Sequence, residues 1–199
     1  LMRIDLLRHG DTGREGYLDG RSDPPLSEMG ARQFAKQTKD RDWTLIVSSP
    51  LARARSTAED LARRTGRAVE IDPAWRELDF GRWDGRSRDE IAAQPADAAL
   101  LQAFYADPAA FNAPGGESWA SLRDRVSRAL DRLIAPPALA PVLVVTHGGT
   151  IRAALSLILN WPLRSLWSLR INPATRITLE VGRGEDGALW GEIVEIIQP

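Results

Sequence analysis

The sequence predicts an α/β domain with a mostly parallel central sheet, helices on both faces and a small inserted helical cap. Short apolar runs at 3–7, 45–47 and 142–145 have the length and composition of buried strands. Segments with helix start and stop signals separate these runs, and such alternation is typical of parallel sheets covered on both faces. The irregular stretch at about 75–117 interrupts the alternation, so we interpret it as the cap.

The helices are predicted from their ends. Ser27 caps a helix that runs to Lys39. Pro50 suits the first turn of a second helix, which Gly66 ends. Further helices are expected at about 117–134 and 150–159, with one or two short ones near 87–106. A weak strand is expected at 68–71, and two late strands at about 175–181 and 190–196 are expected to form a hairpin.

Length and composition limit the possible classes of protein. With 199 residues, 43% of them hydrophobic, the chain suits one domain over 1–199 with a sizeable core. Its net charge of −1 gives no global field that favours nucleic acid or anionic membrane. The absence of cysteine excludes disulfides, thiolate metal sites and cysteine nucleophiles. No apolar run is long enough to span a membrane, and the N-terminus enters a strand at once, so we expect a cytoplasmic location.

The chain has only two histidines, and both stand at the end of an apolar run, directly before glycine. His9 follows the run at 3–7, and His147 follows the run at 142–145. The carboxyl ends of parallel strands share one edge of a sheet, where ligands bind in such folds. We therefore expect the two side chains to meet there. A lone histidine is more often a structural residue, but this repeated placement favours a functional pair.

Histidine and arginine in this pattern point to phosphoryl transfer. A neutral imidazole attacks phosphorus when its other ring nitrogen is held as a donor. The rest of the catalysis is positioning of the phosphoryl group and stabilisation of the charge on its equatorial oxygens. A guanidinium group does this with two parallel hydrogen bonds to the oxygens. Arg8 is adjacent to His9, and Arg53 and Arg55 open the second helix, whose N-terminus is expected to add unpaired N–H groups. His147 is expected to clamp the same phosphoryl group.

The leaving oxygen also needs a proton donor. Glu77 lies in the aromatic stretch 75–83 (WRELDFGRW), where burial can raise the pKa of a carboxylic acid for this task. Asp79 and Asp84 are the competing carboxylates. Two histidines without nearby ligand spacing match no metal site, so no metal and no cofactor are expected.

Four motifs resemble those of the histidine phosphatase superfamily, which includes cofactor-dependent phosphoglycerate mutase. They are 7–12 (LRHGDT), 48–58 (SSPLARARSTA), 77–85 (ELDFGRWDG) and 145–149 (VTHGG). All four occur in order and spread over most of the chain. The resemblance implies that His9 is the nucleophile and that Glu77 is first acid and then base. It also implies that the phosphoryl group is bound by Arg8, Arg53 and His147. Gly148 is expected to let the backbone approach the phosphate.

Further segments indicate a branch within the superfamily. Residues 20–27 (GRSDPPLS) and 115–118 (GGES) resemble the phosphatase branch, and 166–171 (LWSLRI) adds to a likeness with the α-ribazole-5′-phosphate phosphatases of cobalamin synthesis. No paired-arginine cap segment of the kind that mutases use is apparent. Aromatic residues of the cap are expected to form mainly its core, with one or two free to stack on a substrate ring.

Two residues differ from the family pattern, and one group of arginines is expected to have no role in the site. Glu15 stands where many members have an asparagine that contacts phosphate, and it would repel the phosphate unless it points away or pairs with Arg14 or Arg21. Asp84 stands where the family more often has glutamate. The arginines of the 117–134 helix are expected to form a solvated face paired with Asp124 and Asp131; they are Arg123, Arg125, Arg128 and Arg132.

The expected function is therefore a phosphomonoesterase that forms a phosphohistidine and acts on a small molecule, with no nucleic-acid or membrane partner. Two alternatives remain open. One is a mutase-type isomerase, which returns the phosphoryl group to a second hydroxyl. The other is a non-catalytic member that binds a phosphorylated ligand. The sequence leaves the oligomeric state open.

Overall fold

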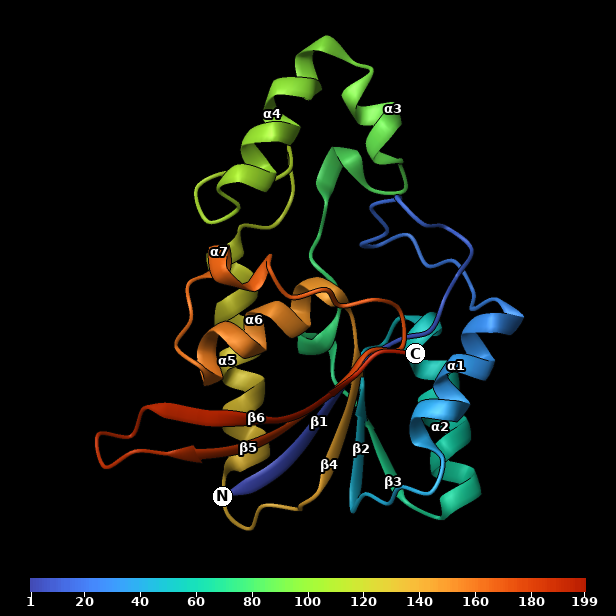
Figure 1. Ribbon diagram of the computed structural model, residues 1–199, viewed down its shortest axis with the longest axis vertical. Helices are drawn as coiled ribbons and strands as arrows, with labels where there is room; N and C mark the ends of the chain where they lie inside the picture. Colours follow the sequence, from blue (N-terminus) through green and yellow to red (C-terminus); the bar gives the residue numbers. More distant parts are fainter.

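The computed structural model describes residues 1–199 and contains a six-stranded sheet in the order β3-β2-β4-β1-β5-β6 (Figure 1). The four strands β3, β2, β4 and β1 run parallel, and β5 and β6 are antiparallel to their neighbours. The expected α/β fold with a mostly parallel sheet is confirmed. The strands are β1 (Met2–Arg8), β2 (Leu45–Ser48), β3 (Ala68–Ile71), β4 (Val142–Thr146), β5 (Arg176–Arg183) and β6 (Leu189–Ile197).

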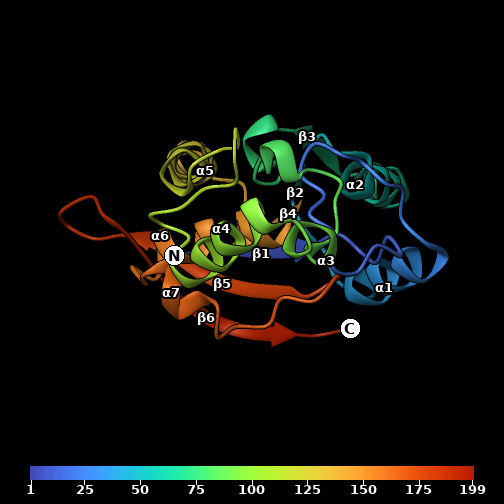
Figure 2. The same cartoon turned by 90° about the horizontal axis from the view of Figure 1, so that it is seen from above.

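Helices cover both faces of the sheet (Figure 2). They are α1 (Glu28–Thr38), α2 (Ala52–Thr65), α3 (Arg88–Ala92), α4 (Pro95–Ala106), α5 (Trp119–Ile134), α6 (Gly148–Ile158) and α7 (Leu163–Leu166). Two short 3-10 helices lie at Pro73–Trp75 and Gly81–Trp83. No helix is long and apolar enough to cross a membrane.

Two hydrophobic cores, one on each face, follow from the alternation of side chains along the strands. Ile4 and Leu6 of β1 pack in the larger core with residues of α5 and α6. Leu7 points to the opposite face and packs with Phe34 of α1 and with apolar residues of α2. Because both faces are covered, the inner strands are apolar throughout, which is why they were recognisable as short apolar runs.

Some helix boundaries differ from those expected. α2 begins at Ala52, so Pro50 precedes the helix instead of lying in its first turn. α6 begins at Gly148, two residues earlier than expected, with His147 as its N-cap residue. The short helix α7 was not predicted, because four residues are too few for a periodic pattern.

The parallel strands bring three chain segments together at the carboxyl edge of the sheet. Arg8 of β1 pairs with Thr146 of β4, and the N–H of His9 donates to the carbonyl of Thr146 at 3.0 Å. On the other side of β4, the N–H of Ser49 donates to the carbonyl of Val145, also at 3.0 Å. The residues that follow β1, β2 and β4 are therefore neighbours.

The segment between the first 3-10 helix and α5 extends beyond this edge, with α3 and α4 at its far end (Figure 1). Trp83 is fully buried there, and its ring meets that of Phe104 edge-on, with centroids 5.9 Å apart. Helices α3 and α4 therefore have an aromatic core of their own that is continuous with the larger core of the sheet.

Candidate active site

The two histidines lie side by side at the carboxyl edge, with ring centroids 5.1 Å apart. Nδ1 of His9 is 2.8 Å from the carbonyl oxygen of Gly10. Since a carbonyl only accepts hydrogen bonds, Nδ1 carries the proton and Nε2 keeps its lone pair. Burial, and then the charges of Arg8 and Arg53, hold the pKa of His9 well below its ordinary value. The ring is therefore neutral at pH 7, as a nitrogen nucleophile must be.

Glycine follows His9 because two backbones meet closely at this position. A Cβ atom at Gly10 would lie 2.1 Å from the carbonyl oxygen of Gly30 at the start of α1. Any side chain at position 10 would push α1 away and shift the carbonyl that orients the His9 ring.

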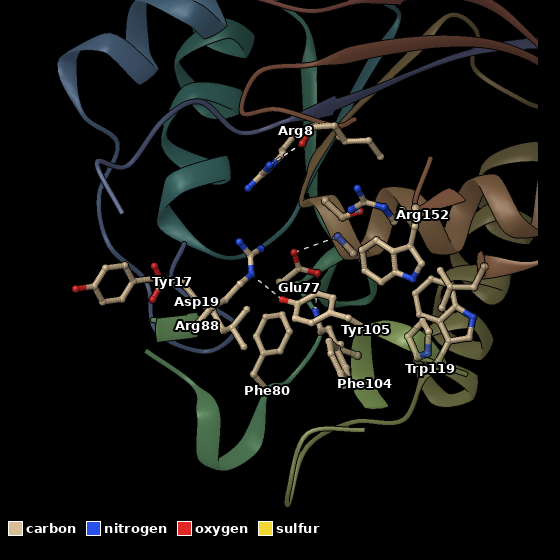
Figure 3. A pocket seen from close by; sticks show the side chains of 18 of the residues that line it. Arg8, Tyr17, Asp19, Glu77, Phe80, Arg88, Phe104, Tyr105, Trp119 and Arg152 are labelled. Atoms are coloured by element: carbon tan, nitrogen blue, oxygen red, sulfur yellow. Dashed lines mark hydrogen bonds between the residues drawn. The ribbon is translucent and has the colours of Figure 1, made fainter. Parts of the chain in front are cut away.

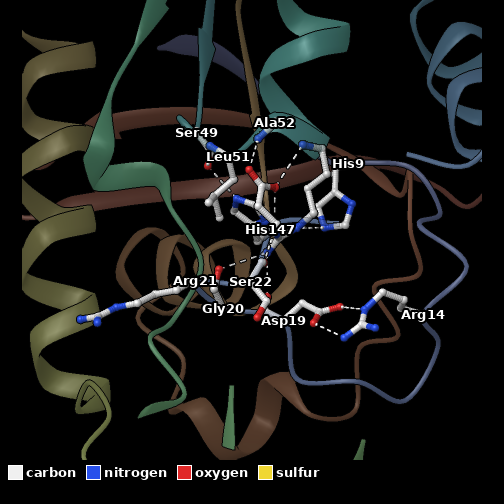
Figure 4. A network of polar contacts seen from close by, with 12 residues as sticks. His9, Arg14, Asp19, Gly20, Arg21, Ser22, Ser49, Leu51, Ala52 and His147 are labelled. Carbon is white, nitrogen blue, oxygen red and sulfur yellow. Dashed lines mark hydrogen bonds and ion pairs between the residues drawn. The ribbon is translucent and has the colours of Figure 1, made fainter. Parts of the chain in front are cut away.

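Arg53 lies beside the free nitrogen of His9. Its guanidinium donates from Nε to Nε2 of His9 at 3.3 Å, and its side chain is only 2% exposed. The other two nitrogens donate to the carbonyls of Asp19 at 2.7 Å and Ser22 at 2.8 Å. The guanidinium is thus held in one orientation by the loop after β1. Figure 4 shows Asp19 and Ser22 in this loop, with the Asp19 carboxylate bound by Arg14.

That loop is itself held by Asp84. The carboxylate of Asp84 accepts hydrogen bonds from the backbone N–H groups of Gly20 and Arg21, each at 2.8 Å, and from the hydroxyl of Ser22 at 2.5 Å. Burial alone would raise the pKa of Asp84, but these hydrogen bonds hold it below its ordinary value. Asp84 therefore orients Arg53 indirectly, and it is too fully engaged to act as the proton donor.

The N-terminus of α2 does not offer the free N–H groups that the sequence suggested. Asp23 accepts a hydrogen bond from the N–H of Ala52 at 2.6 Å and also pairs with Arg53. This carboxylate caps the helix from a distant loop. The prediction that the helix N-terminus offers unpaired N–H groups to the phosphoryl group is therefore wrong. Arg55 is also outside the site, since it pairs with Glu59 on the surface.

His147 is fully buried, and its Nε2 lies 2.7 Å from the hydroxyl of Ser49. The Ser49 oxygen accepts from the N–H of Leu51 at 3.2 Å, and its own proton has no other acceptor than His147. Ser49 therefore donates to Nε2, which places the ring proton on Nδ1. Nδ1 is buried and has no partner within the protein. Sequence reasoning did not single out Ser49, although it lies within the second motif.

Replacing Ser49 with alanine should lower kcat by roughly tenfold to a hundredfold, because a buried hydrogen bond that fixes the His147 tautomer is lost. Nitrogen NMR of the imidazole should show loss of the Nδ1-protonated form. The control is Ser48→Ala, since the hydroxyl of Ser48 donates to the carbonyl of Ser49 and not to a histidine. Equal loss of activity in both variants would contradict this role of Ser49.

Glu77 faces the same cavity as His9. Its carboxylate accepts hydrogen bonds from the N–H of Leu78 at 2.8 Å and from the N–H of Gly149 at 3.2 Å. A Cβ atom at Gly149 would lie 2.4 Å from Oε1 of Glu77, so only glycine leaves room for the carboxylate. The competitor Asp79 instead pairs with Arg21 at 2.6 Å. Of the three carboxylates considered, only Glu77 lines this cavity.

The backbone of Glu77 is fixed by a buried ion pair. Arg125 donates to the carbonyls of Ala74 at 2.7 Å, Arg76 at 2.8 Å and Glu77 at 3.0 Å. The same guanidinium binds both carboxylate oxygens of Glu117, at 2.7 and 2.9 Å. Arg125 is therefore a buried residue that fixes the backbone around Glu77. The prediction that it lies on a solvated face is wrong.

The other predicted pairings along α5 also differ. Arg123 donates to the hydroxyl of Ser156 at 3.0 Å, and Arg132 pairs with Asp72 at 2.7 Å. Asp131 pairs with Arg183 of β5. These partners lie on distant segments, which spacing along one helix cannot reveal.

A cavity of about 600 Å³ is lined by His9, Arg53 and Glu77, and the fully buried His147 adjoins His9 outside this lining. Figure 3 shows Arg8 and Glu77 in this cavity. Arg8 reaches it from the end of β1, with Nη1 donating to the carbonyl of Ile171 at 2.6 Å and with Nε buried and unpartnered. Burial, followed by the charges of neighbouring arginines, lowers the pKa of Arg8 to about 10, although Glu77 opposes this shift. Gly148 lies next to the Arg8 guanidinium at the start of α6. Arg8, Arg53, His147 and Gly148 are thus brought together around His9.

The outer walls of the cavity are aromatic and basic. Glu15 is exposed and does not line the cavity, so its charge points away from the site; Arg14 pairs instead with Asp19 at 2.8 Å. Trp75 and Trp83 are buried core residues. The aromatic residues that line the cavity are Tyr17, Phe80, Phe104, Tyr105, Phe111, Trp119 and Trp167.

The family model described as the histidine phosphatase superfamily, branch 1, matches residues 4–190. The chain belongs to this superfamily. The family membership predicted from the four motifs is confirmed. This membership supports the prediction that the protein is an enzyme. The roles of the individual residues in this histidine phosphatase stay predictions.

Named relatives include both mutases and phosphatases. A "probable phosphoglycerate mutase GpmB" of Erwinia tasmaniensis is 31% identical over 176 residues, 86% of this chain and 81% of the relative. A mycobacterial glucosyl-3-phosphoglycerate phosphatase in complex with VO3 superposes with a TM-score of 0.85 and 29% identity, covering 98% of each chain. The α-ribazole phosphatase of Shigella flexneri has a TM-score of 0.80 and 24% identity over 96% of this chain and 94% of its own, a likeness of fold alone.

The histidine phosphatase should lose stability as pH falls from 7 to 5. Burial first, and nearby arginine charges second, hold the pKa values of His9 and His147 well below the ordinary value. The unfolded chain therefore binds protons near pH 6.5 that the folded chain does not, so the free energy of unfolding decreases below that pH. The chain has no other histidine, so these two side chains are the imidazoles that can contribute to the decline.

Denaturant unfolding at a series of pH values tests this expectation, and His147→Asn should show a shallower decline between pH 7 and 5. A decline of equal steepness in the variant would contradict it.

Proposed function

We propose that this histidine phosphatase is a phosphomonoesterase that forms a phosphohistidine on His9. The observation that carries the proposal is the neutral His9 ring, with Nδ1 donating to Gly10 and Nε2 lying beside the Arg53 guanidinium. A ring nitrogen with a free lone pair next to a fixed cation is suited to attack a phosphoryl group.

In the first step Nε2 of His9 bonds to phosphorus, and the bond between phosphorus and the alcohol oxygen breaks. Arg8, Arg53 and the Nδ1–H of His147 stabilise the charge on the equatorial oxygens. The leaving oxygen takes the proton of the Glu77 carboxylic acid, so the alcohol departs neutral.

In the second step the resulting Glu77 carboxylate removes a proton from water. The water oxygen bonds to phosphorus, the bond from phosphorus to Nε2 breaks, and inorganic phosphate leaves. His9 is then neutral again and Glu77 is protonated, so the cycle closes without a metal or a cofactor.

Two small-molecule substrates are specific candidates. α-Ribazole 5′-phosphate is favoured by the segments at 20–27 and 115–118, which resemble the phosphatase branch, together with 166–171, which adds to the likeness with its phosphatases; its ring system suits an aromatic wall. Glucosyl-3-phosphoglycerate is the substrate named for the mycobacterial neighbour at 29% identity. That neighbour has been solved in complex with VO3 and with inorganic phosphate, and the similarity supports a phosphoryl-binding role for this chain. We also propose a cytoplasmic location, since charged phosphate esters cross membranes at a high energetic cost.

A mutase is the second candidate function, because the relatives at 31% identity are named phosphoglycerate mutases. In that reaction the phosphohistidine returns its group to a second hydroxyl instead of to water. A mutase must bind the intermediate tightly and exclude water, so interconversion of 2- and 3-phosphoglycerate would outpace release of inorganic phosphate.

The test measures phosphate release from p-nitrophenyl phosphate, both candidate substrates, sugar phosphates and nucleotides, alongside interconversion of the phosphoglycerates. We expect release from several esters, and unchanged rates after dialysis against a chelator. Interconversion faster than release would favour the mutase. Activity lost on chelation and restored by a divalent ion would contradict the mechanism, and binding of esters without turnover would identify a non-catalytic member.

A further inference from the structure

The turn at residues 170–175, between α7 and β5, holds Arg8, the last residue of β1, and His9, which follows it. The carbonyl of Ile171 accepts a hydrogen bond from Nη1 of Arg8 at 2.6 Å. The N–H of Ala174 donates to the carbonyl of His9 at 2.9 Å, and the N–H of Arg8 donates to the carbonyl of Thr175 at 3.0 Å. The turn therefore contacts the backbone of both site residues and the guanidinium of Arg8.

The Ile171 carbonyl is the one hydrogen-bond partner of the Arg8 side chain within the protein. Nε of Arg8 is buried and has no partner. Arg53, by contrast, is fixed by two backbone carbonyls and by the carboxylate of Asp23. The direction of the Arg8 guanidinium thus depends on where the turn places a single carbonyl oxygen.

The turn has a backbone conformation that is unfavourable for its sequence. Ala174 has a φ of 60° and is fully buried. A residue with a Cβ atom rarely adopts this left-handed region. Inside the turn, the N–H of Thr175 donates to the carbonyl of Asn172 at 3.0 Å. Such a conformation persists where contacts from other segments hold it in place.

Gln198, which directly follows β6, supplies two such contacts. Its Nε2 donates to the carbonyl of Arg170 at 2.6 Å, and its Oε1 accepts from the hydroxyl of Thr175 at 2.6 Å. Because a carbonyl only accepts hydrogen bonds, the amide nitrogen must face Arg170 and the amide oxygen must face Thr175. One side chain therefore joins the first and the last residue of the turn.

The Thr175 hydroxyl makes this bridge more than a surface contact. Thr175 is fully buried, and the Gln198 amide is the one partner of its hydroxyl. The backbone beside Gln198 is also held, because Gln37 of α1 is buried and donates from Nε2 to the carbonyl of Ile197 at 3.1 Å. Gln198 is exposed, yet it is fixed both by the turn and by its own backbone.

We propose that Gln198 is a positioning residue of the phosphoryl site. Its amide closes the turn, the turn places the Ile171 carbonyl, and this carbonyl directs the Arg8 guanidinium toward the phosphoryl group. The inference rests on the proposed phosphomonoesterase function. Gln198 does not line the cavity, so it acts through Arg8 and does not touch the substrate.

The test is a double-mutant cycle between Gln198 and Arg8, with p-nitrophenyl phosphate as substrate. Gln198→Ala should lower kcat/KM about threefold to tenfold, and should weaken competitive inhibition by inorganic phosphate by a similar factor. In the background of Arg8→Met, which has no donor for the Ile171 carbonyl, the same substitution should change kcat/KM less than about twofold. Equal losses in both backgrounds are the mark of a merely structural role and would overturn the inference.

Two variants of Thr175 and a matched control complete the cycle. Thr175→Val keeps the shape of the buried side chain without its hydroxyl and should reproduce the loss seen in Gln198→Ala, whereas Thr175→Ser should retain activity. The control is Gln102→Ala, since Gln102 is an exposed glutamine of α4 that does not line the cavity. It should keep the wild-type kcat/KM, and a Gln198→Ala protein that also keeps it would reject the role of Gln198.

Failure of the proposed function is a separate result, which hydrogen exchange at the Arg8 side chain distinguishes. Proton–nitrogen NMR should show a slowly exchanging Nε–H signal that is absent from Arg8→Met. Gln198→Ala should speed this exchange about threefold or more, whether or not any ester is hydrolysed. An unchanged rate, or fast exchange already in the wild type, rejects the inference even in an active phosphatase. A faster rate in a protein that releases no phosphate rejects the proposed function alone.

Discussion

Replacing His9 with alanine should reduce phosphate release on the order of 10⁴-fold or more, because no other group can form the covalent intermediate. His147 does not substitute, since its Nε2 is engaged by Ser49 and its ring is fully buried. The measurement is phosphate release from p-nitrophenyl phosphate, with brief labelling by a phosphorus-labelled ester that is quenched in alkaline detergent. Wild-type protein should carry an acid-labile phosphoryl group, and the variant should carry none.

The fold should survive this change, because the His9 side chain lines a cavity and makes two hydrogen bonds, one to the carbonyl of Gly10 and one from Nε of Arg53. Retained binding of inorganic phosphate to His9→Ala would show that the arginines remain in place. A variant that still turns over at a tenth of the wild-type rate would reject His9 as the nucleophile.

Replacing Glu77 with glutamine should lower kcat by roughly 10²–10⁴-fold for alkyl phosphates, which need a proton on the leaving oxygen. p-Nitrophenolate leaves without a proton, so the first step with its ester should be much less impaired. The second step needs a base to activate water, so the phosphohistidine should accumulate. We therefore expect a rapid burst of one p-nitrophenol per active site, followed by slow turnover.

The matched control is Asp79→Asn, since Asp79 pairs with Arg21 outside this cavity. It should change kcat less than tenfold and show no burst. If alkyl and aryl esters were slowed equally by Glu77→Gln, without a burst, Glu77 would not be the proton donor.

The fold and the centre of the site were predictable because they depend on local signals. Buried parallel strands read as apolar runs, and the residue after each strand faces the carboxyl edge whatever the rest of the chain does. The positions of His9 and His147 in the sequence therefore predicted where the site lies. Gly10 and Gly149 were part of the motifs, but the close contacts that require glycine there, with Gly30 and Glu77, are seen only in the folded structure.

The supporting residues were not predictable because their partners are distant in sequence. Asp23 caps α2 from a loop 29 residues away, and Arg125 binds carbonyls about 50 residues before it. Helical spacing predicted surface pairs for Arg125, but tertiary contacts decided its burial. Three further arginines that line the cavity belong to three separate segments, so no adjacent pair in the sequence indicated them. They are Arg88, Arg152 and Arg170.

The buried contacts of Arg125 have a consequence for how this enzyme can diversify. One guanidinium joins the two ends of the stretch between Ala74 and Glu117, and the N–H of Glu117 also donates to the carbonyl of Asp79 at 2.9 Å. The chain between Asp79 and Glu117 follows Glu77, and lengthening a loop whose ends are already fixed costs little free energy. We therefore expect insertions in this stretch to alter the wall of the cavity without moving Glu77 relative to His9.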